Sequence, residues 1–169
     1  FQVAIHAVTE AAVESAVTAV ERVGGDTASG RGLRHRIEHA SVCPPHLLQR
    51  IRDAGIGIVT QPAFLYHSGE RFLDTVDPQD VPWLYRATAF HRAGIPVAAS
   101  SDAPVAPLDP RPGLYSAVTR RSRAGRIVGE PDGLTIEDAL ALHTRHAAHL
   151  THQDTQRGTI AIGKLADLA

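Results

Sequence analysis

Short, apolar, strand-like runs alternate with helical patterns four times along the chain, and this alternation constrains the fold more than any other feature. The strand-like runs are Phe1–His6, Arg34–His39, Gly57–Gln61 and Val97–Ser101. The helical patterns cover Ala11–Val23, the residues between Pro44 and Gly55, Val81–Arg92, Gly113–Ala124 and Ile136–Leu150. Strands that alternate with helices predict βαβ units and a parallel sheet. Four such units can form a small open sheet or half of an eight-stranded barrel, and periodicity alone does not choose between them.

Two segments between these elements are predicted to be loops. Ala63–Pro78 has the pattern of an uncommonly long loop, a kind that often serves as a binding loop or lid. Asp102–Pro112 is rich in proline. The last helix has a capping-box-like start, because Thr135 is followed three residues later by Asp138.

The composition argues against several classes of partner. Seventeen basic and 18 acidic residues give a net charge of -1, and no block of like charges runs along the chain. Binding to nucleic acid or to an anionic membrane surface is therefore not indicated. The apolar runs are too short for a membrane span, and no signal-peptide pattern is visible. The single cysteine, Cys43, is compatible with a reducing compartment, and we expect a cytoplasmic protein.

Three potential metal ligands stand at or just after the carboxyl ends of strand-like runs. His6 ends the first run, His39 ends the second, and Asp102 follows the fourth. Catalytic groups of parallel β/α folds gather at that edge. Because side chains alternate along a strand, Ile37 is expected to share the face of His39. Two imidazoles and one carboxylate suit zinc, which makes hydroxide available at neutral pH, and the carboxylate can shuttle its proton.

Other polar residues allow several interpretations. Gln61, Ser100 and His67 are candidates for contacting a substrate, the last from the expected long loop. A lone histidine at the end of a strand is more often structural than a ligand. The last helix carries His143, His146 and His149, whose spacing spreads them over roughly 120°, so at most two could share one ion. A solvated or interfacial face is the simpler explanation for that set.

Four motifs in order resemble the amidohydrolase superfamily. They are QVAIHA at 2–7, RHRIEHA at 34–40, SDAPV at 101–105 and GTIAIGKLADL at 158–168. The chain is most similar to the amidohydrolase family 3 branch, which includes YtcJ-like and N-substituted formamide deformylase-like proteins. Each motif alone is weak, whereas the ordered set covers nearly the whole chain and is specific.

The resemblance implies the C-terminal half, strands five to eight, of a metal-dependent hydrolase (β/α)8 barrel. It matches His6 and His39 to the histidine ligands of strands five and six. Asp102 matches the aspartate of strand eight, which binds the metal and acts as general base and acid. The implied cofactor is a divalent metal, most often zinc, as one or two ions. Residues 1–155 would be the half-barrel, and 156–169 the truncated start of a return to a small β-sandwich.

The sequence also departs from the family pattern. Family members commonly have His-Ala-Ile-Gly-Asp after the fifth strand, where this chain has Val8, Thr9 and Glu10 after His6 and Ala7. The His-x-His pair of the first strand has no counterpart here. We therefore expect the chain alone to be an incomplete catalyst, with its partner either the missing N-terminal half or a second copy at the exposed sheet edges.

The function expected from these observations is hydrolysis of a non-peptide, amide-like C–N bond in a small molecule, through a metal-activated water. Two alternatives remain open. One is a non-catalytic remnant that acts as an interaction or structural module. The other is a related metal-dependent esterase, lactonase or phosphotriesterase that uses the same water.

Overall fold

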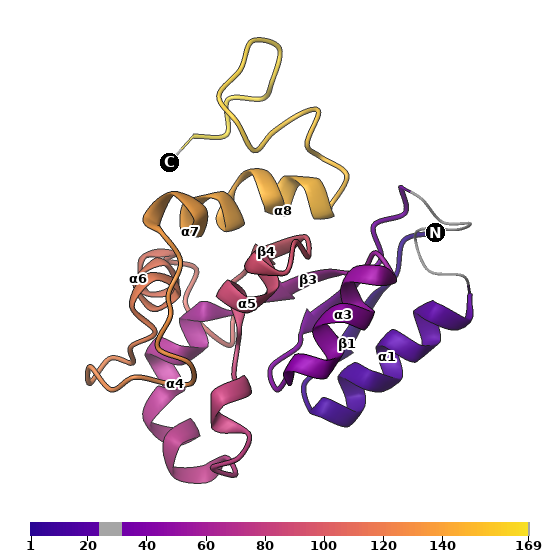
Figure 1. The fold of residues 1–169 in the computed structure, drawn as a ribbon. Coiled ribbons are helices and arrows are strands. Elements are labelled where there is room, and N and C mark those ends of the chain that lie inside the picture. Colours follow the sequence, from indigo (N-terminus) through magenta and orange to yellow (C-terminus); the bar gives the residue numbers. More distant parts are fainter. Residues whose placement is uncertain (24–31, 169) are drawn as a thin grey trace.

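The computed structural model describes residues 1–23 and 32–168. Its centre is a four-stranded parallel sheet with the order β1-β2-β3-β4 (Figure 1). The strands are β1 (Ala4–Ala7), β2 (Arg36–His39), β3 (Gly57–Thr60) and β4 (Val97–Ala99). The expected parallel sheet is confirmed. Because each strand pairs with the next one along the chain, β1 and β4 form its outer edges.

Helical elements separate and follow the strands. They are α1 (Glu10–Arg22), α3 (Pro45–Asp53), α4 (Pro62–Thr75), the 3-10 helix η1 (Val81–Trp83), α5 (Ala87–Arg92), α6 (Arg111–Thr119), α7 (Ile136–His143) and α8 (Arg145–Leu150). Ile37, Ile58 and Val97 point from the strands into a buried apolar core that α1, α3 and α5 complete. Figure 1 shows these three helices beside the sheet. Burial of this core is the main force that holds the half-barrel together.

The other face of the sheet is more open and more polar. Ala4 pairs in register with Arg36, and His6 with Glu38, so these side chains share a face. Ala4 and His6 are exposed, whereas Arg36 and Glu38 are partly buried. The Arg36 Nε donates a hydrogen bond of 2.6 Å to Glu38 Oε1. In a closed barrel this face would line the interior.

The segment expected to be a long loop is a helix, so the prediction for Ala63–Pro78 is wrong. Helix α4 spans Pro62–Thr75, with proline in its first turn, where its missing N–H costs nothing. Gly69 allows the helix to pack closely, because a Cβ there would lie 2.6 Å from Ser122 Cβ and 2.9 Å from Val128 Cγ2. In this helix the glycine makes a tight contact and the proline stands in the first turn.

Three other predicted helices differ from the structure. Val81–Arg92 is interrupted, because Leu84 forms an antiparallel bridge with Val42, and Tyr85 N donates to Ser41 O at 2.9 Å. Helix α6 begins at Arg111 and ends before Arg120, which adopts a φ of 56°. Thr144 separates α7 from α8. The predicted start of α7 is confirmed, since Thr135 Oγ1 accepts from Asp138 N at 3.1 Å.

The end of the described chain has few regular contacts. After α8, residues 151–168 form turns, and Figure 1 shows this segment projecting beyond the helices. Ile160 and Ile162 are almost fully exposed, at 92% and 108%. Such exposure fits the prediction that 156–169 begins a return to another domain, and that division stays a prediction.

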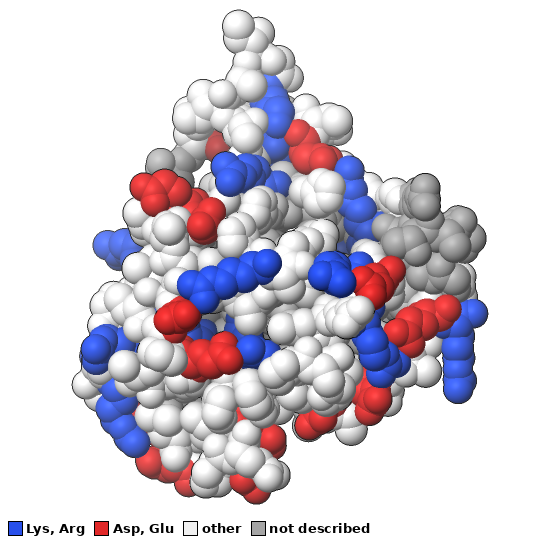
Figure 2. Space-filling model, viewed as in Figure 1, with Lys and Arg blue, Asp and Glu red and all other residues white. Residues whose placement is uncertain are grey.

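Acidic and basic side chains intermix over the face seen in Figure 2, with no broad area of one sign. Within the described ranges, every helix is too short or too polar to cross a bilayer.

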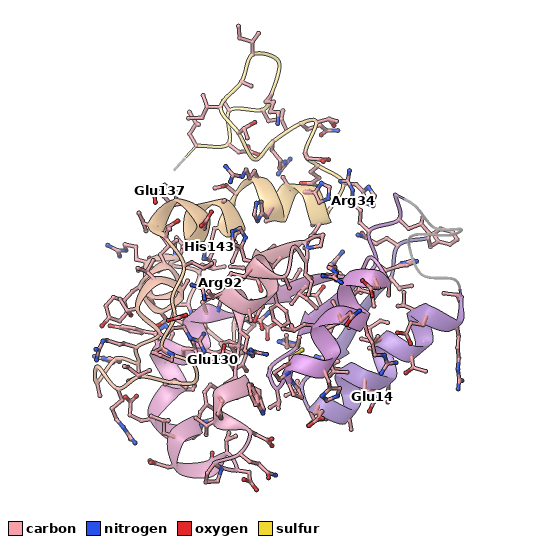
Figure 3. The ribbon with its side chains drawn as sticks, viewed as in Figure 1. Glu14, Arg34, Arg92, Glu130, Glu137 and His143 are labelled. Carbon is pink, nitrogen blue, oxygen red and sulfur yellow. The ribbon has the colours of Figure 1, made fainter. Side chains whose placement is uncertain are left out.

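His143 is a titratable side chain packed among helices α7, α6 and α4. Figure 3 shows it projecting from α7 toward the interior. A Cβ at Gly113 would lie 3.5 Å from its Nε2, which places the ring against α6. Among the described residues, the buried Nε2 has no hydrogen-bond partner. Burial lowers the pKa of His143 because it penalises the imidazolium.

This histidine is expected to weaken the fold as pH falls. The unfolded chain takes up the proton near its ordinary pKa, about 6.5, whereas the folded chain resists it until lower pH. Stability is therefore full above that value and decreases as pH falls through it. Urea unfolding at pH 7.5, 6.5 and 5.5 should show a smaller decrease for His143→Gln than for the native chain. The exposed His152→Gln should keep the native decrease, and equal slopes in all three proteins would refute the assignment.

Candidate functional site

The carboxyl ends of β1 and β2 bring two of the predicted ligands together. The rings of His6 and His39 have centroids 4.5 Å apart and an interplanar angle of 75°. The His6 ring is exposed on the open face, whereas His39 is buried, with 8% of its surface accessible. One exposed and one supported imidazole therefore meet at the edge where parallel β/α folds place catalytic groups.

His39 reaches this place because its backbone leaves the regular strand conformation. Its φ is 76°, and that of Ala40 is 46°. Simple alternation would put His39 on the same face as Ile37, which is fully buried against the helices. The positive φ instead turns the imidazole toward His6, so the expectation that Ile37 shares its face is wrong. Left-handed backbone at non-glycine residues costs energy and often marks functional positions.

Gln61 fixes the orientation of the His39 ring. Its amide Nε2 donates to Ser100 Oγ at 3.0 Å and to Val59 O at 3.3 Å. Both bonds use the amide nitrogen, which leaves Oε1 facing His39 Nδ1 at 2.8 Å. Because an amide oxygen only accepts, Nδ1 carries the proton and Nε2 keeps a free lone pair. That is the arrangement in which histidine binds metals, with an oxygen acceptor behind the ring.

The position of Gln61 also changes how its predicted role is understood. It was a candidate for contacting substrate, yet its side chain is almost inaccessible, at 1%. Its contacts run to His39 and Ser100, and the latter is partly buried behind it. This positioning role had no signal in the sequence beyond the placement of Gln61 at the end of a strand-like run.

No contact joins Asp102 to His6 or His39 among the described residues. Asp102 is exposed, follows β4 in a turn, and has a φ of 54°. Burial raises the pKa of Tyr85, and the negative charge of Asp102 adds to the rise. Within the described ranges no three His, Cys, Asp or Glu side chains form a metal-holding group. The ligand set of His6, His39 and Asp102 therefore stays a prediction.

Two further candidates lie outside the histidine pair. His67 is exposed on α4, and its ring packs edge-on against Tyr66 at 5.1 Å. Glu10, in the segment that departs from the family pattern, lies 3.6 Å from His46 Nε2 on α3. No contact connects either residue with the His6 ring among those that the structure describes.

The alternation of side chains along a strand predicts that Glu38 faces away from His39. Glu38 stands on the open face beside His6 and is held by Arg36. Alternation along β2 places Glu38 on the open face, and its pairing with His6 shows that the two residues are adjacent. A carboxylate at this position adds negative charge next to the imidazole pair.

Comparison with known proteins gives matches along the whole chain. The sequence profile of the amidohydrolase family matches residues 1–169. YtcJ of Bacillus subtilis is 30% identical over 98% of this chain and 31% of its own length. The N-substituted formamide deformylase of Arthrobacter pascens is 29% identical over 98% of this chain and 30% of its own length. The chain thus spans about a third of these relatives.

A solved structure shows the same fold. An uncharacterised metal-dependent hydrolase from Pyrococcus horikoshii superposes with a TM-score of 0.82 and 27% identity, over 98% of this chain and 32% of that protein. This match confirms the predicted fold class, an incomplete (β/α)8 barrel of the metal-dependent hydrolase type.

Proposed function

Because the chain belongs to the amidohydrolase family, we propose that it supplies the carboxyl-terminal part of a metal-dependent active site that hydrolyses non-peptide C–N bonds. The observation that carries the proposal is the His6–His39 pair, with Gln61 behind the second ring. The C–N bond class is supported by the formamide deformylase relative, which is similar to nearly all of this chain. A hydrolase of esters, lactones or phosphotriesters remains the second candidate, because it would use the same water.

The residues present fit a divalent metal. His39 offers Nε2 from a ring that Gln61 orients, and the exposed His6 ring meets it at the open face. Imidazole nitrogens suit zinc. When bound, the metal would lower the pKa of a water to about 7 and polarise the substrate carbonyl. Glu38 and Asp102 would provide negative charge around such an ion.

Asp102 would transfer the proton from the attacking water to the leaving nitrogen. Its carboxylate is exposed at the carboxyl end of β4 and is free to accept a proton from the attacking water. Passing that proton to the departing nitrogen would release the amine, which leaves poorly as an anion. His6 and His39 would hold the metal, while Ser100 and Gln61 keep the second imidazole in place.

The open face of the sheet requires a second component. On the open face of the described chain, His6 and His39 meet without a third ligand, and the barrel-facing side chains of β1 are exposed. We propose that strands from outside this chain close the barrel and contribute the remaining ligands. Association of two copies through the edges at β1 and β4 is the alternative, because unpaired edges invite pairing.

Metal content per chain tests the proposal directly. Protein purified without chelator is expected to hold about one zinc ion per chain at this site by elemental analysis. His39→Ala should lower the metal content by that one ion, whereas His46→Ala, on the exposed surface of α3, should not. With the barrel closed by the second component, amine release from an N-substituted formamide should then follow the zinc content of this site. A folded chain that holds no metal, or one whose metal content is the same after His39→Ala, would reject this site and favour the interaction-module alternative.

A further inference from the structure

A second group of histidines lines a cavity at the opposite edge of the sheet. The cavity has a volume of about 330 Å³ and lies where the chain enters β4. Its walls are the backbone of residues 94–97, the side chain of Leu150, and the imidazoles of His91, His146 and His149. The candidate active site stands at the carboxyl ends of the strands, whereas this cavity lies at the amino end of β4. The two sites are therefore separate.

The two histidines of α8 are both held through the same ring nitrogen. His146 Nδ1 lies 3.1 Å from Val97 O, and His149 Nδ1 lies 3.0 Å from Asp154 Oδ2. A carbonyl oxygen only accepts, so His146 Nδ1 carries the proton. Asp154 Oδ1 also forms an ion pair with Arg34 Nη1 at 3.0 Å, and an ionised carboxylate accepts only. Both rings therefore carry hydrogen on Nδ1.

The other ring nitrogens of these two residues are not used by these contacts. Within the described residues, neither His146 Nε2 nor His149 Nε2 has a hydrogen-bond partner, and both residues line the cavity. An oxygen acceptor behind Nδ1 is the support that metal-bound histidines usually have. Residues three apart on a helix also lie on one face, as they do in known metal-binding pairs.

His91 forms a wall of the cavity. Its ring stacks on His146, with centroids 6.2 Å apart and an interplanar angle of 23°. Its Nε2 lies 3.6 Å from Asp138 Oδ1, which directs that nitrogen away from the pair on α8. His91 is therefore not counted as a ligand. No group of three ligands occurs in the described ranges, so the site has two protein ligands.

We propose that His146 and His149 form a second transition-metal site, in which their Nε2 atoms bind one Cu²⁺ or Zn²⁺ ion and solvent in the cavity completes the coordination. Imidazole suits both ions, and Cu²⁺ binds nitrogen sites more tightly than Zn²⁺. Sequence spacing alone had allowed two of the three histidines to share an ion. The structure selects this pair, because His143 is packed under Gly113 in another direction.

Copper titration tests this site independently of the proposed active site. In a His6→Asn/His39→Asn chain, Cu²⁺ is expected to bind with one ion per chain, and its EPR spectrum should show hyperfine coupling to two nitrogens. His146→Asn and His149→Asn should each weaken binding at least tenfold and reduce the coupling to one nitrogen. His152→Asn, just beyond α8 and outside the cavity, is the matched control and should bind as the parent does.

The outcomes are distinguishable. Undiminished copper binding in His149→Asn, or an equal loss in His152→Asn, would overturn the proposal. If the His6→Asn/His39→Asn chain does not fold, the native chain is used instead. The expected result is then that His149→Asn binds one ion fewer than the two bound by the native chain. Retention of both ions in His149→Asn would reject the second site. Failure of the proposed active site at His6 and His39 would not affect the proposal for His146 and His149.

Discussion

Replacing Asp102 with asparagine is expected to lower amine release by about 10³-fold while the chain remains folded, because proton transfer by a positioned side chain contributes about 10²- to 10⁴-fold. Asparagine matches the size of aspartate but cannot take up the proton of the attacking water. It also tolerates left-handed backbone, so the φ of 54° at this position is preserved. The measurement is turnover of an N-substituted formamide by the metal-loaded preparation that hydrolyses it, with metal content determined in parallel.

Asp109→Asn is the matched control for this prediction. Asp109 lies in the same loop, and its carboxylate is hydrogen-bonded by Arg111 at 2.8 and 2.9 Å. That hydrogen bonding lowers the pKa of Asp109, and the pair is a surface feature. Turnover by this variant should therefore stay near the native value. Equal losses in both variants, or full turnover by Asp102→Asn, would remove Asp102 from the proposed proton path.

The parts of the fold that the sequence predicts are those set by local periodicity. Apolar runs such as Gly57–Gln61 favour buried strands, and the helical spacing of Val13, Val17 and Val20 matches the buried stripe of α1. Their order then implies a parallel sheet, and the sheet places His6 and His39 at one edge. The sequence therefore predicts that the two residues lie at the same edge, but not that their rings face each other.

The errors occur where tertiary packing overrides local signals. Ala63–Pro78 was predicted to be a loop, yet most of it is helix α4, and the missing side chain of Gly69 lets this helix approach Ser122. The break before α5 depends on the pairing of Leu84 with Val42, which are far apart in sequence. The turn of His39 toward His6 requires a positive φ, which a histidine at this position does not predict. Long-range contacts, rather than propensity, decide each of these features.

Arg120→Met is expected to lower the free energy of unfolding by about 3 kcal/mol or more. The reason is that each buried acceptor left unpaired costs about 1–3 kcal/mol. The guanidinium is buried, with 3% of the residue accessible. It donates to the carbonyl oxygens of Leu84 and Tyr85 at 2.7 Å, of Val128 at 3.0 Å and of Glu130 at 3.1 Å. Burial lowers its pKa to about 10, so it remains charged at neutral pH.

The consequence should extend to the candidate active site. Leu84 and Tyr85 pair with the segment that follows His39, and Arg120 is the cation that holds their carbonyl groups. Urea unfolding measures the loss of stability, and hydrogen exchange of the Tyr85 amide, which donates to Ser41 O, reports local opening. Arg121→Met, an exposed neighbour, should change stability by no more than about 0.5 kcal/mol. A similar loss in both variants would show that the buried carbonyl network does not carry the effect. Faster exchange at Tyr85 together with weaker zinc binding in Arg120→Met would instead connect this buried cation to the support of His39.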